Sequence, residues 1–343
     1  MQCKNSVKLK LIKRFNVKQM QYVLNMKKYL IVSVLIFVIS CTTKSGVDKE
    51  IEKISIDLEF VRFDKIFGEA KIEDIPDLKK QYPSFFPEQY HDSIWIQKMR
   101  DTLQQQLYEE VIKKYATEDK FEDDLVALFQ HIEYYFPQIT TPLVVTATSD
   151  VDYRNKIILS DSLLIIGLDS YLGRDHFFYE GIPKYLSQNM KESQIISDVA
   201  SVYAQNLVPK PRNRTFLSHI IYYGKRLYLK DLWMTNILDS EKIGYTKEEL
   251  LWAKDNEVEI WRNFVENEFL YSTNPKLSSR FINPAPFSKF YLEIDNDSPG
   301  MIGRFIGWEI VRAYMEHNSV SLQEMLTQNA EEIFNKSKYK PKK

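Results

Sequence analysis

Residues 142–166 read PLVVTATSDVDYRNKIILSDSLLII, and this stretch decides the fold class. Three short apolar runs, rich in β-branched residues, occupy 142–146, 156–160 and 163–166. Turn-forming Asp and Ser residues separate the runs, which is the pattern of consecutive strands. The stretch predicts one small β-sheet in the middle of the chain, arranged as a meander.

Helical periodicity surrounds this segment on both sides. Apolar residues over 92–115 and 121–136 recur at the spacing of one helical face. A last helix is predicted to begin at Ser298-Pro299, a favourable N-cap and N1 pair. Between the strands and this helix, the pattern predicts helices near 175–190, 191–207, 213–230 and 247–269. The predicted fold class is therefore α+β, predominantly α-helical, with one small β-sheet.

Length and composition permit one large domain. The chain has 343 residues, of which 44% are hydrophobic and 27% charged, as in an ordinary globular protein. We expect a single globular domain over 51–335 and a Lys-rich tail at 336–343. Residues 271–299 contain four prolines and predict a long loop. Loops of this length in compact domains are usually functional.

Charge is distributed unevenly along the chain. Residues 1–40 contain eight Lys and Arg and no Asp or Glu, so the remainder has 38 basic and 47 acidic residues, a net charge of −9. An acidic body lacks the basic surface of a nucleic-acid-binding protein. We therefore expect no nucleic-acid partner.

The N-terminal segment has the features of a secretory signal peptide. Residues 29–40 (YLIVSVLIFVIS) carry no charge and follow Lys27 and Lys28. A helix of this length spans about 18 Å, which is less than the bilayer core of about 30 Å. A basic region followed by a short apolar region predicts a signal peptide over 1–40. Met26 offers a second start, in which case 1–25 is an upstream extension.

The signal peptide ends in a motif that predicts a lipid anchor. Val38-Ile39-Ser40-Cys41 resembles the lipobox of bacterial lipoproteins, in which the peptide is cleaved before the cysteine and the cysteine is acylated. Several acyl chains hold a protein firmly on a membrane. We expect lipid attachment at Cys41, a polar tether over 41–50 and a globular domain outside the cytoplasm, with the inner or outer membrane left open. The alternative is a plain signal anchor that contains a cysteine.

The chain lacks the common catalytic signatures. It contains no G-x-S-x-G, no phosphate loop, no G-x-G-x-x-G and no H-x-x-x-H, and its five histidines are far apart. A zinc site needs about three ligands held on a helix or short loop. Cys41 is the only cysteine after the signal peptide, so cysteine zinc sites are excluded as well. We expect no catalytic residue, no metal and no cofactor.

Three of the ten glycines lie close together at 300, 303 and 307. Glycine within a helix costs about 1 kcal/mol relative to alanine. The cluster therefore indicates either close helix packing, which we favour, or a helix N-terminus that accepts an anion.

Five short motifs follow one another along the chain. They are VRFD (61–64), GLDSYLG (167–173), IPKYL (182–186), IYYGKRLY (221–228) and SPGMIGR (298–304). Together with the lipobox, they resemble the gliding-motility lipoprotein B family of Bacteroidota over nearly all of 41–335. The resemblance implies an envelope lipoprotein needed for surface gliding, a process coupled to type IX protein secretion in that phylum.

A more distant resemblance concerns zincin-type metalloproteases. A sheet followed by two helices, the second ending in a G-x-x-x-Y turn at 224–228, is similar to their layout. The segment 195–202 has no histidine where those enzymes carry H-E-x-x-H. The resemblance implies a degenerate, non-catalytic zincin-like fold, and a coincidence of layout is the alternative. Candidate residues of the vestigial cleft are Asp198, His219, Tyr223 and Lys225.

Three functions stay open. We favour a non-enzymatic lipoprotein that acts through protein–protein contacts with the gliding and type IX secretion machinery. Aromatic residues are typical interface anchors, and the candidate contact loop offers Phe281, Phe287, Phe290 and Tyr291. These rings would otherwise pack beneath the loop. The alternatives are an envelope hydrolase, with or without a metal ion, that uses Asp198, His219 or His176, and a lipoprotein that binds a peptide or glycan in the zincin-like cleft.

Overall fold

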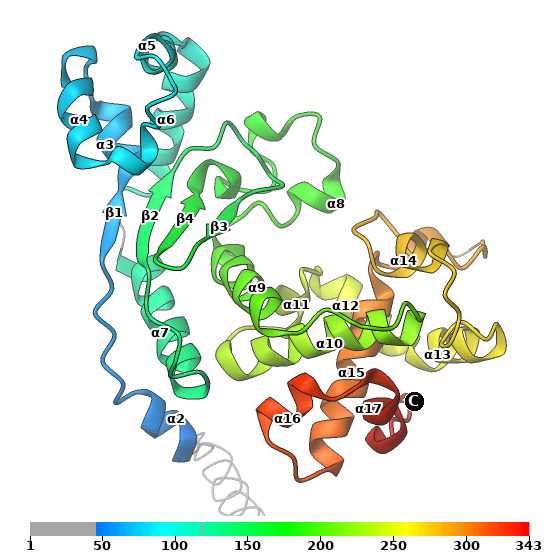
Figure 1. The fold of residues 1–343 in the computed structure, drawn as a ribbon. Helices are drawn as coiled ribbons and strands as arrows, with labels where there is room; N and C mark the ends of the chain where they lie inside the picture. The colour runs from blue at the N-terminus through cyan, green and yellow to red at the C-terminus, as the bar shows by residue number, and fades with distance from the viewer. Residues whose placement is uncertain (1–45, 118, 294, 343) are drawn as a thin grey trace, which may run out of the picture. The chain divides into compact units, whose positions relative to one another are not determined.

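The computed structural model describes residues 46–117, 119–293 and 295–342 (Figure 1). The chain divides into two compact units, and the first ends at Lys53. In the first unit, helix α2 (Gly46–Ile51) includes the C-terminal part of the predicted tether. The signal peptide and Cys41 lie outside the described residues. Among the helices that are described, none has the length and apolar character needed to cross a bilayer.

A four-stranded sheet lies in the second unit, with the strand order β1-β2-β4-β3. Its strands are β1 (Phe60–Arg62), β2 (Leu143–Ala147), β3 (Ile157–Leu159) and β4 (Leu163–Gly167). β2 pairs in parallel with β1 and with β4, whereas β3 and β4 are antiparallel. The predicted small sheet is confirmed, but the meander is wrong, because β4 crosses over to pair with β2. Short apolar runs occur in parallel and in antiparallel strands, so they do not indicate which strands pair.

Helices that follow β1 form the N-terminal part of this unit. They are α3 (Phe63–Glu69), α4 (Ile75–Gln81), α5 (Ser93–Arg100), α6 (Thr102–Lys114) and α7 (Asp119–Tyr135). The helix predicted over 121–136 is confirmed as α7. The helix predicted over 92–115 is divided in two at Asp101, whose carboxylate accepts hydrogen bonds from the backbone N–H groups of Leu103 and Gln104. A side chain that caps one helix in this way interrupts a continuous apolar period.

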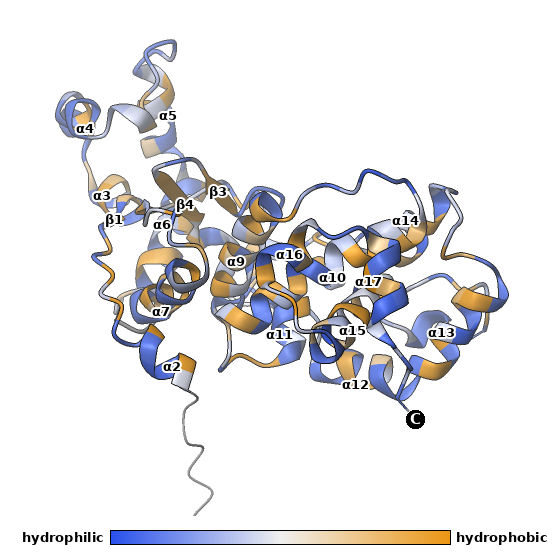
Figure 2. Ribbon diagram, turned by 60° about the horizontal axis from the view of Figure 1, so that its bottom comes forward, coloured by the Kyte–Doolittle hydropathy of each residue, from blue (hydrophilic) through white to orange (hydrophobic). Residues whose placement is uncertain are grey.

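The C-terminal part is helical as well. Its helices are α8 (Lys184–Ser187), α9 (Ile195–Leu207), α10 (Phe216–Trp233), α11 (Asp239–Ile243), α12 (Lys247–Asp255), α13 (Glu257–Glu266), α14 (Lys276–Phe281), α15 (Ile302–His317), α16 (Leu322–Thr327) and α17 (Ala330–Ser337). The segment 247–269 is divided at Asn256, and the long loop 271–299 contains α14. Where one helix is predicted near 175–190, the structure has a short 3-10 helix (Phe177–Tyr179) and the short α8. Figure 2 shows hydrophilic and hydrophobic turns alternating along helices such as α12 and α13, as expected for helices with one buried face.

Helices α10 and α15 cross at a contact between their backbones. A methyl group built on Gly307 would overlap the carbonyl oxygen of Ile220, and one built on Gly224 would overlap the carbonyl oxygen of Gly307. The close packing predicted from the glycine cluster is therefore confirmed. α10 also continues without a break through 224–228, so the G-x-x-x-Y turn of the zincin-like layout is wrong.

The start of α15 differs from the prediction. The helix begins at Ile302 and not at Pro299, and Met301 before it adopts the left-handed conformation with φ 57°. Ser298 is buried and hydrogen-bonds Ser288 instead of capping the helix. The Ser288 hydroxyl accepts from the Ile302 N–H at 3.2 Å and donates to the Pro299 carbonyl at 2.7 Å. A long-range partner thus replaces the local cap that the sequence offers.

The predicted C-terminal tail is packed against the domain. Ser337 is buried, and the Tyr339 hydroxyl donates to the Glu257 carboxylate at 2.6 Å. The Tyr339 ring also meets Trp261 edge-on, with 5.1 Å between the ring centroids. The Lys-rich composition of this segment gives no indication of these two anchoring residues, and the boundary at residue 335 stays a prediction.

Gly307→Ala is expected to lower the free energy of unfolding by about 2–3 kcal/mol. The new methyl group would meet the backbone of Ile220, which can move aside only if α10 and α15 separate. Urea unfolding followed by circular dichroism measures this loss. Gly46→Ala is the control, because nothing lies within 4 Å of the added methyl group. Equal stability of the two variants would contradict the role of the crossing.

Candidate functional site

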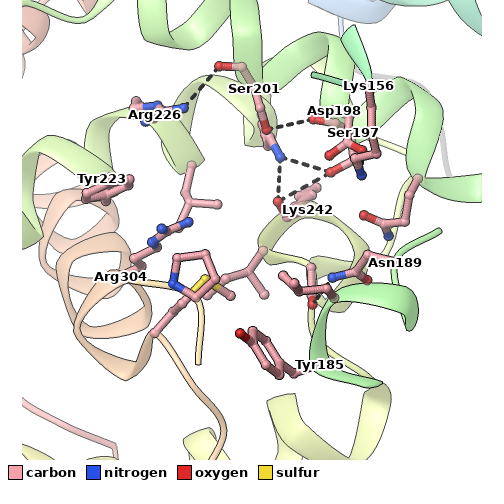
Figure 3. Close-up of a pocket in the computed structure, with 18 of the residues that line it drawn as sticks. Lys156, Tyr185, Asn189, Ser197, Asp198, Ser201, Tyr223, Arg226, Lys242 and Arg304 are labelled. Atoms are coloured by element: carbon pink, nitrogen blue, oxygen red, sulfur yellow. Dashed lines mark hydrogen bonds and ion pairs between the residues drawn. The ribbon is translucent and has the colours of Figure 1, made fainter. Parts of the chain in front are cut away.

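A cavity of about 250 Å³ opens where α9, α10 and α11 face the first turn of α15. Its wall contains one carboxylate, Asp198. Figure 3 shows Arg226, Tyr223 and Arg304 on one side, with Lys156, Asp198 and Ser197 on the other. The five basic residues in the wall are Lys156, Arg226, Lys230, Lys242 and Arg304. In a chain body with excess negative charge, this is a concentration of positive charge.

Two groups already engage the Asp198 carboxylate. Lys156 forms an ion pair with it, and the Tyr171 hydroxyl donates to the same carboxylate oxygen at 2.9 Å. The Lys156 ammonium also lies 4.9 Å from the centre of the Tyr171 ring. The one negative charge of the cavity wall is therefore matched by Lys156.

The Lys242 ammonium is paired with two carboxylates that are not part of the cavity wall. It lies 3.1 Å from an Asp231 oxygen and 3.3 Å from an Asp239 oxygen. Arg312 binds both oxygens of Asp231, each at 2.7 Å. This network balances the charge of Lys242, so what Lys242 supplies to the cavity is its backbone carbonyl.

Lys230 is buried in the wall of the cavity and has no carboxylate within ion-pair distance among the described residues. Its ammonium donates to the Ser197 hydroxyl at 2.9 Å and to the Lys242 carbonyl at 2.7 Å. Burial is the main cause that lowers the pKa of Lys230 to about 7. Asp198 opposes this shift, and the positive charges of Arg226, Arg304 and Lys156 add to it.

Arg226 and Arg304 face the same aromatic ring. Their guanidinium carbons lie 5.2 Å and 4.2 Å from the centre of the Tyr223 ring. The Arg304 Nε donates to the Ile282 carbonyl at 2.7 Å, and burial lowers the pKa of this guanidinium. Within the described part of the chain, neither arginine has a carboxylate partner. Two guanidinium groups therefore lie beside one ring, and no carboxylate among the described residues neutralises them.

The residues proposed for the vestigial cleft are only partly brought together. Asp198 and Tyr223 line the cavity, whereas His219 and Lys225 do not. Lys225 lines a second cavity with Lys210 and Arg212. There its ammonium donates to the carbonyls of Leu326 and Gln328 at 2.9 Å and 2.6 Å, and burial lowers its pKa to about 8. Burial also lowers the pKa of His219.

The candidate contact loop presents its rings in different ways. Phe281 is fully buried and packs against Phe264, with 5.0 Å between the ring centroids. Phe287 and Phe290 are half-buried, and Tyr291 is 73% exposed. Phe281 therefore packs under the loop, and of the four candidate contact rings Tyr291 is the one most open to solvent. His176, proposed for the hydrolase, instead lies 3.3 Å from Glu110.

Sequence reasoning missed Arg226, Lys230 and Arg304. A signal for the first two was present, since they are four residues apart on α10 and share a helical face with apolar neighbours. Arg304 comes from α15, and its place beside them depends on the helix crossing. Their geometry suits the binding of an anion, because every free group is a hydrogen-bond donor with positive charge. No cluster of three His, Cys, Asp or Glu side chains able to hold a metal occurs among the described residues.

Lys230→Met is expected to change how stability depends on pH. The unfolded chain holds the Lys230 proton up to about pH 10, whereas the folded chain loses it near pH 7. Stability contributed by this residue therefore rises with pH across this interval. Between about pH 7 and pH 9, wild type should gain about 2 kcal/mol relative to Lys230→Met. Parallel stability curves, measured by urea unfolding, would contradict the lowered pKa.

The family model described as gliding motility protein GldB matches residues 44–341. No curated protein and no solved structure matches the chain. The matched range contains every residue of the cavity wall and nearly all of the described chain. Membership implies a lipoprotein of the cell envelope that takes part in gliding motility. The chain therefore belongs to the GldB family, as the order of its short motifs predicted.

Proposed function

We propose that this chain serves gliding motility as a lipid-anchored binding protein and not as an enzyme. The observation that carries the proposal is the chemistry of the cavity. Three cations, Arg226, Lys230 and Arg304, line it, and none of them has a carboxylate partner among the described residues. The carboxylate that could act as a base, Asp198, is engaged by Lys156 and Tyr171. Such a site is suited to holding a ligand with negative charge.

We place its partners in the gliding machinery and in the coupled type IX secretion system. Membership of the GldB family supports the link to gliding. The contact loop supports a protein interface, since Tyr291 is 73% and Leu292 55% exposed. Large exposed apolar side chains next to one another are typical of interaction surfaces. Arg280 lies 4.5 Å from the Tyr291 ring centre and adds a positive charge to this surface.

Lipid attachment at Cys41 completes the proposal. An anchored domain meets membrane-bound partners at a much higher effective concentration than a free one. The anchor therefore serves to keep the contact loop and the cavity at the envelope surface where the machinery assembles.

Deleting the protein should abolish colony spreading and single-cell gliding. Wild type should restore both, and Cys41→Ala should fail to restore them because the domain would leave the membrane. Microscopy of single cells on glass and immunoblots of membrane fractions measure the two effects. Cys3→Ala is the matched control, since this cysteine precedes the cleavage point. A deletion strain that still glides would overturn the proposed function.

Tyr291→Ala should impair gliding while leaving the melting temperature unchanged. The ring is largely exposed and contributes little to the core. Tyr90→Ala is the matched control, because Tyr90 is also exposed, at 47%, but lies outside the loop 271–299. If both variants glide like wild type at normal protein levels, this loop is not the contact surface.

A further inference from the structure

We propose that the cavity binds a phosphoryl group, carried by a small phosphate ester or a lipid head group, through Arg226, Lys230 and Arg304. The inference rests on the proposed binding function and names the class of ligand that the site takes. It follows from three features of the cavity: its unbalanced charge, the placement of its donors and its size.

The unbalanced charge favours a dianion. Lys156 and Asp198 neutralise each other, and Lys242 is neutralised by Asp231 and Asp239. Arg226, Lys230 and Arg304 are left without a carboxylate partner among the described residues, so the cavity has between two and three unpaired positive charges near neutral pH, where Lys230 titrates. Buried charges are costly unless they are paired. A carboxylate or a sulfate ester supplies one negative charge, whereas a phosphate monoester supplies nearly two at neutral pH.

The donors are held in place before a ligand arrives. The Tyr223 ring lies against both guanidinium groups, and the Ile282 carbonyl fixes the Nε of Arg304 at 2.7 Å. That bond leaves the terminal nitrogens of Arg304 without a hydrogen-bond partner among the described residues. Guanidinium groups bind phosphate oxygens with two parallel hydrogen bonds. Two such groups beside one ring can therefore hold two or three phosphate oxygens.

Lys230 and Gln194 extend this set of donors. Two of the three ammonium hydrogens of Lys230 are used by Ser197 and Lys242, which leaves one for a ligand. Gln194 is 2% exposed, lines the cavity, and its Nε2 has no hydrogen-bond partner among the described residues. A buried amide donor without a partner is unfavourable. Both groups are better satisfied when an anion occupies the cavity.

The size and the walls of the cavity favour a small organic phosphate. Its volume of about 250 Å³ exceeds that of a bare phosphate ion. Tyr185, Met190 and Met301 add apolar surface to the wall that holds the cations. This combination, a few convergent polar groups with apolar walls, is typical of ligand sites.

Isothermal titration calorimetry of the full-length lipoprotein in detergent tests the proposal. Glycerol 3-phosphate is the probe, and glycerol and acetate are the neutral and monoanionic comparisons. We expect saturable binding of glycerol 3-phosphate and at least about tenfold weaker binding of acetate. Arg226→Gln and Arg304→Gln should each weaken phosphate binding by about tenfold. No saturable binding, or equal binding of acetate, would overturn the inference.

Arg280→Gln is the matched control. Arg280 has surroundings similar to those of Arg304. Its Nε donates to the Lys289 carbonyl at 2.7 Å, and its guanidinium carbon lies 4.5 Å from the Tyr291 ring centre. It lies outside the cavity wall, so its loss should leave phosphate binding unchanged. If Arg304→Gln does not fold, Arg226→Gln decides the test, since Arg226 makes only two hydrogen bonds to described residues, both at 3.3 Å. Wild-type affinity in the folded variants would overturn the inference.

Proton uptake supplies a second readout. Asp198, Arg226, Arg304 and Lys156 set the charge around Lys230, whose pKa is about 7 without ligand. A bound dianion raises this pKa, so binding at about pH 8 should take up a proton. Titrations in buffers of different ionisation enthalpy measure the uptake, and Lys230→Met should abolish it. If wild type binds the phosphate without taking up a proton, Lys230 does not take part in binding it.

Short-chain phosphatidic acid distinguishes the two sources of the phosphoryl group, with short-chain phosphatidylcholine as its control. Tighter binding of phosphatidic acid than of glycerol 3-phosphate supports a lipid head group, and the reverse order supports a soluble ester. The gliding assay keeps this test separate from the proposed function. A chain that binds no phosphate but is needed for gliding refutes the inference alone, whereas a deletion strain that glides refutes the function whatever the chain binds.

Discussion

The backbone contact between α10 and α15 determines where the basic residues of the cavity meet. α10 carries Tyr223, Arg226 and Lys230, and α15 carries Arg304 three residues before Gly307. Because Gly307 lies against the backbone of Ile220, the two helices approach more closely than side chains would allow. Arg304 therefore reaches the same ring as Arg226 (Figure 3). Without this crossing Arg304 would not share a cavity with Arg226 and Lys230.

Charge balance differs between the two groups of buried ions that this helix pair carries. Farther along the helices, Asp231 accepts hydrogen bonds from Trp308 and Arg312 and pairs with Lys242, so each cation there has a carboxylate. In the cavity, three cations share no free carboxylate. Leaving buried cations without carboxylates costs free energy, and proteins concentrate such costs at functional sites. We therefore associate the cavity with a ligand.

Local pattern accounts for much of the fold and for little of the site. Helix α7 depends on residues that are close in sequence, and it was predicted. The start of α15 was not, because Ser288 from the preceding loop replaces the local cap. Strand pairing was missed for a similar reason. β2 pairs with β4 and not with β3, the next strand in the chain, and periodicity within a strand does not indicate its partner. Of the proposed cleft residues, Asp198 and Tyr223 line the cavity, whereas Lys225 points from α10 into a second one.

The family, the helical class and the expectation of a lipid anchor came from the order of motifs and from local composition alone. Such features depend on neighbours within a few residues, so one sequence is sufficient to show them. The site depended on tertiary structure, because Arg226 and Lys230 on α10 and Arg304 on α15 are about 80 residues apart along the chain. Glycine backbones in contact and a shared aromatic ring bring them together. Only the folded chain shows which of its many cations have no carboxylate beside them.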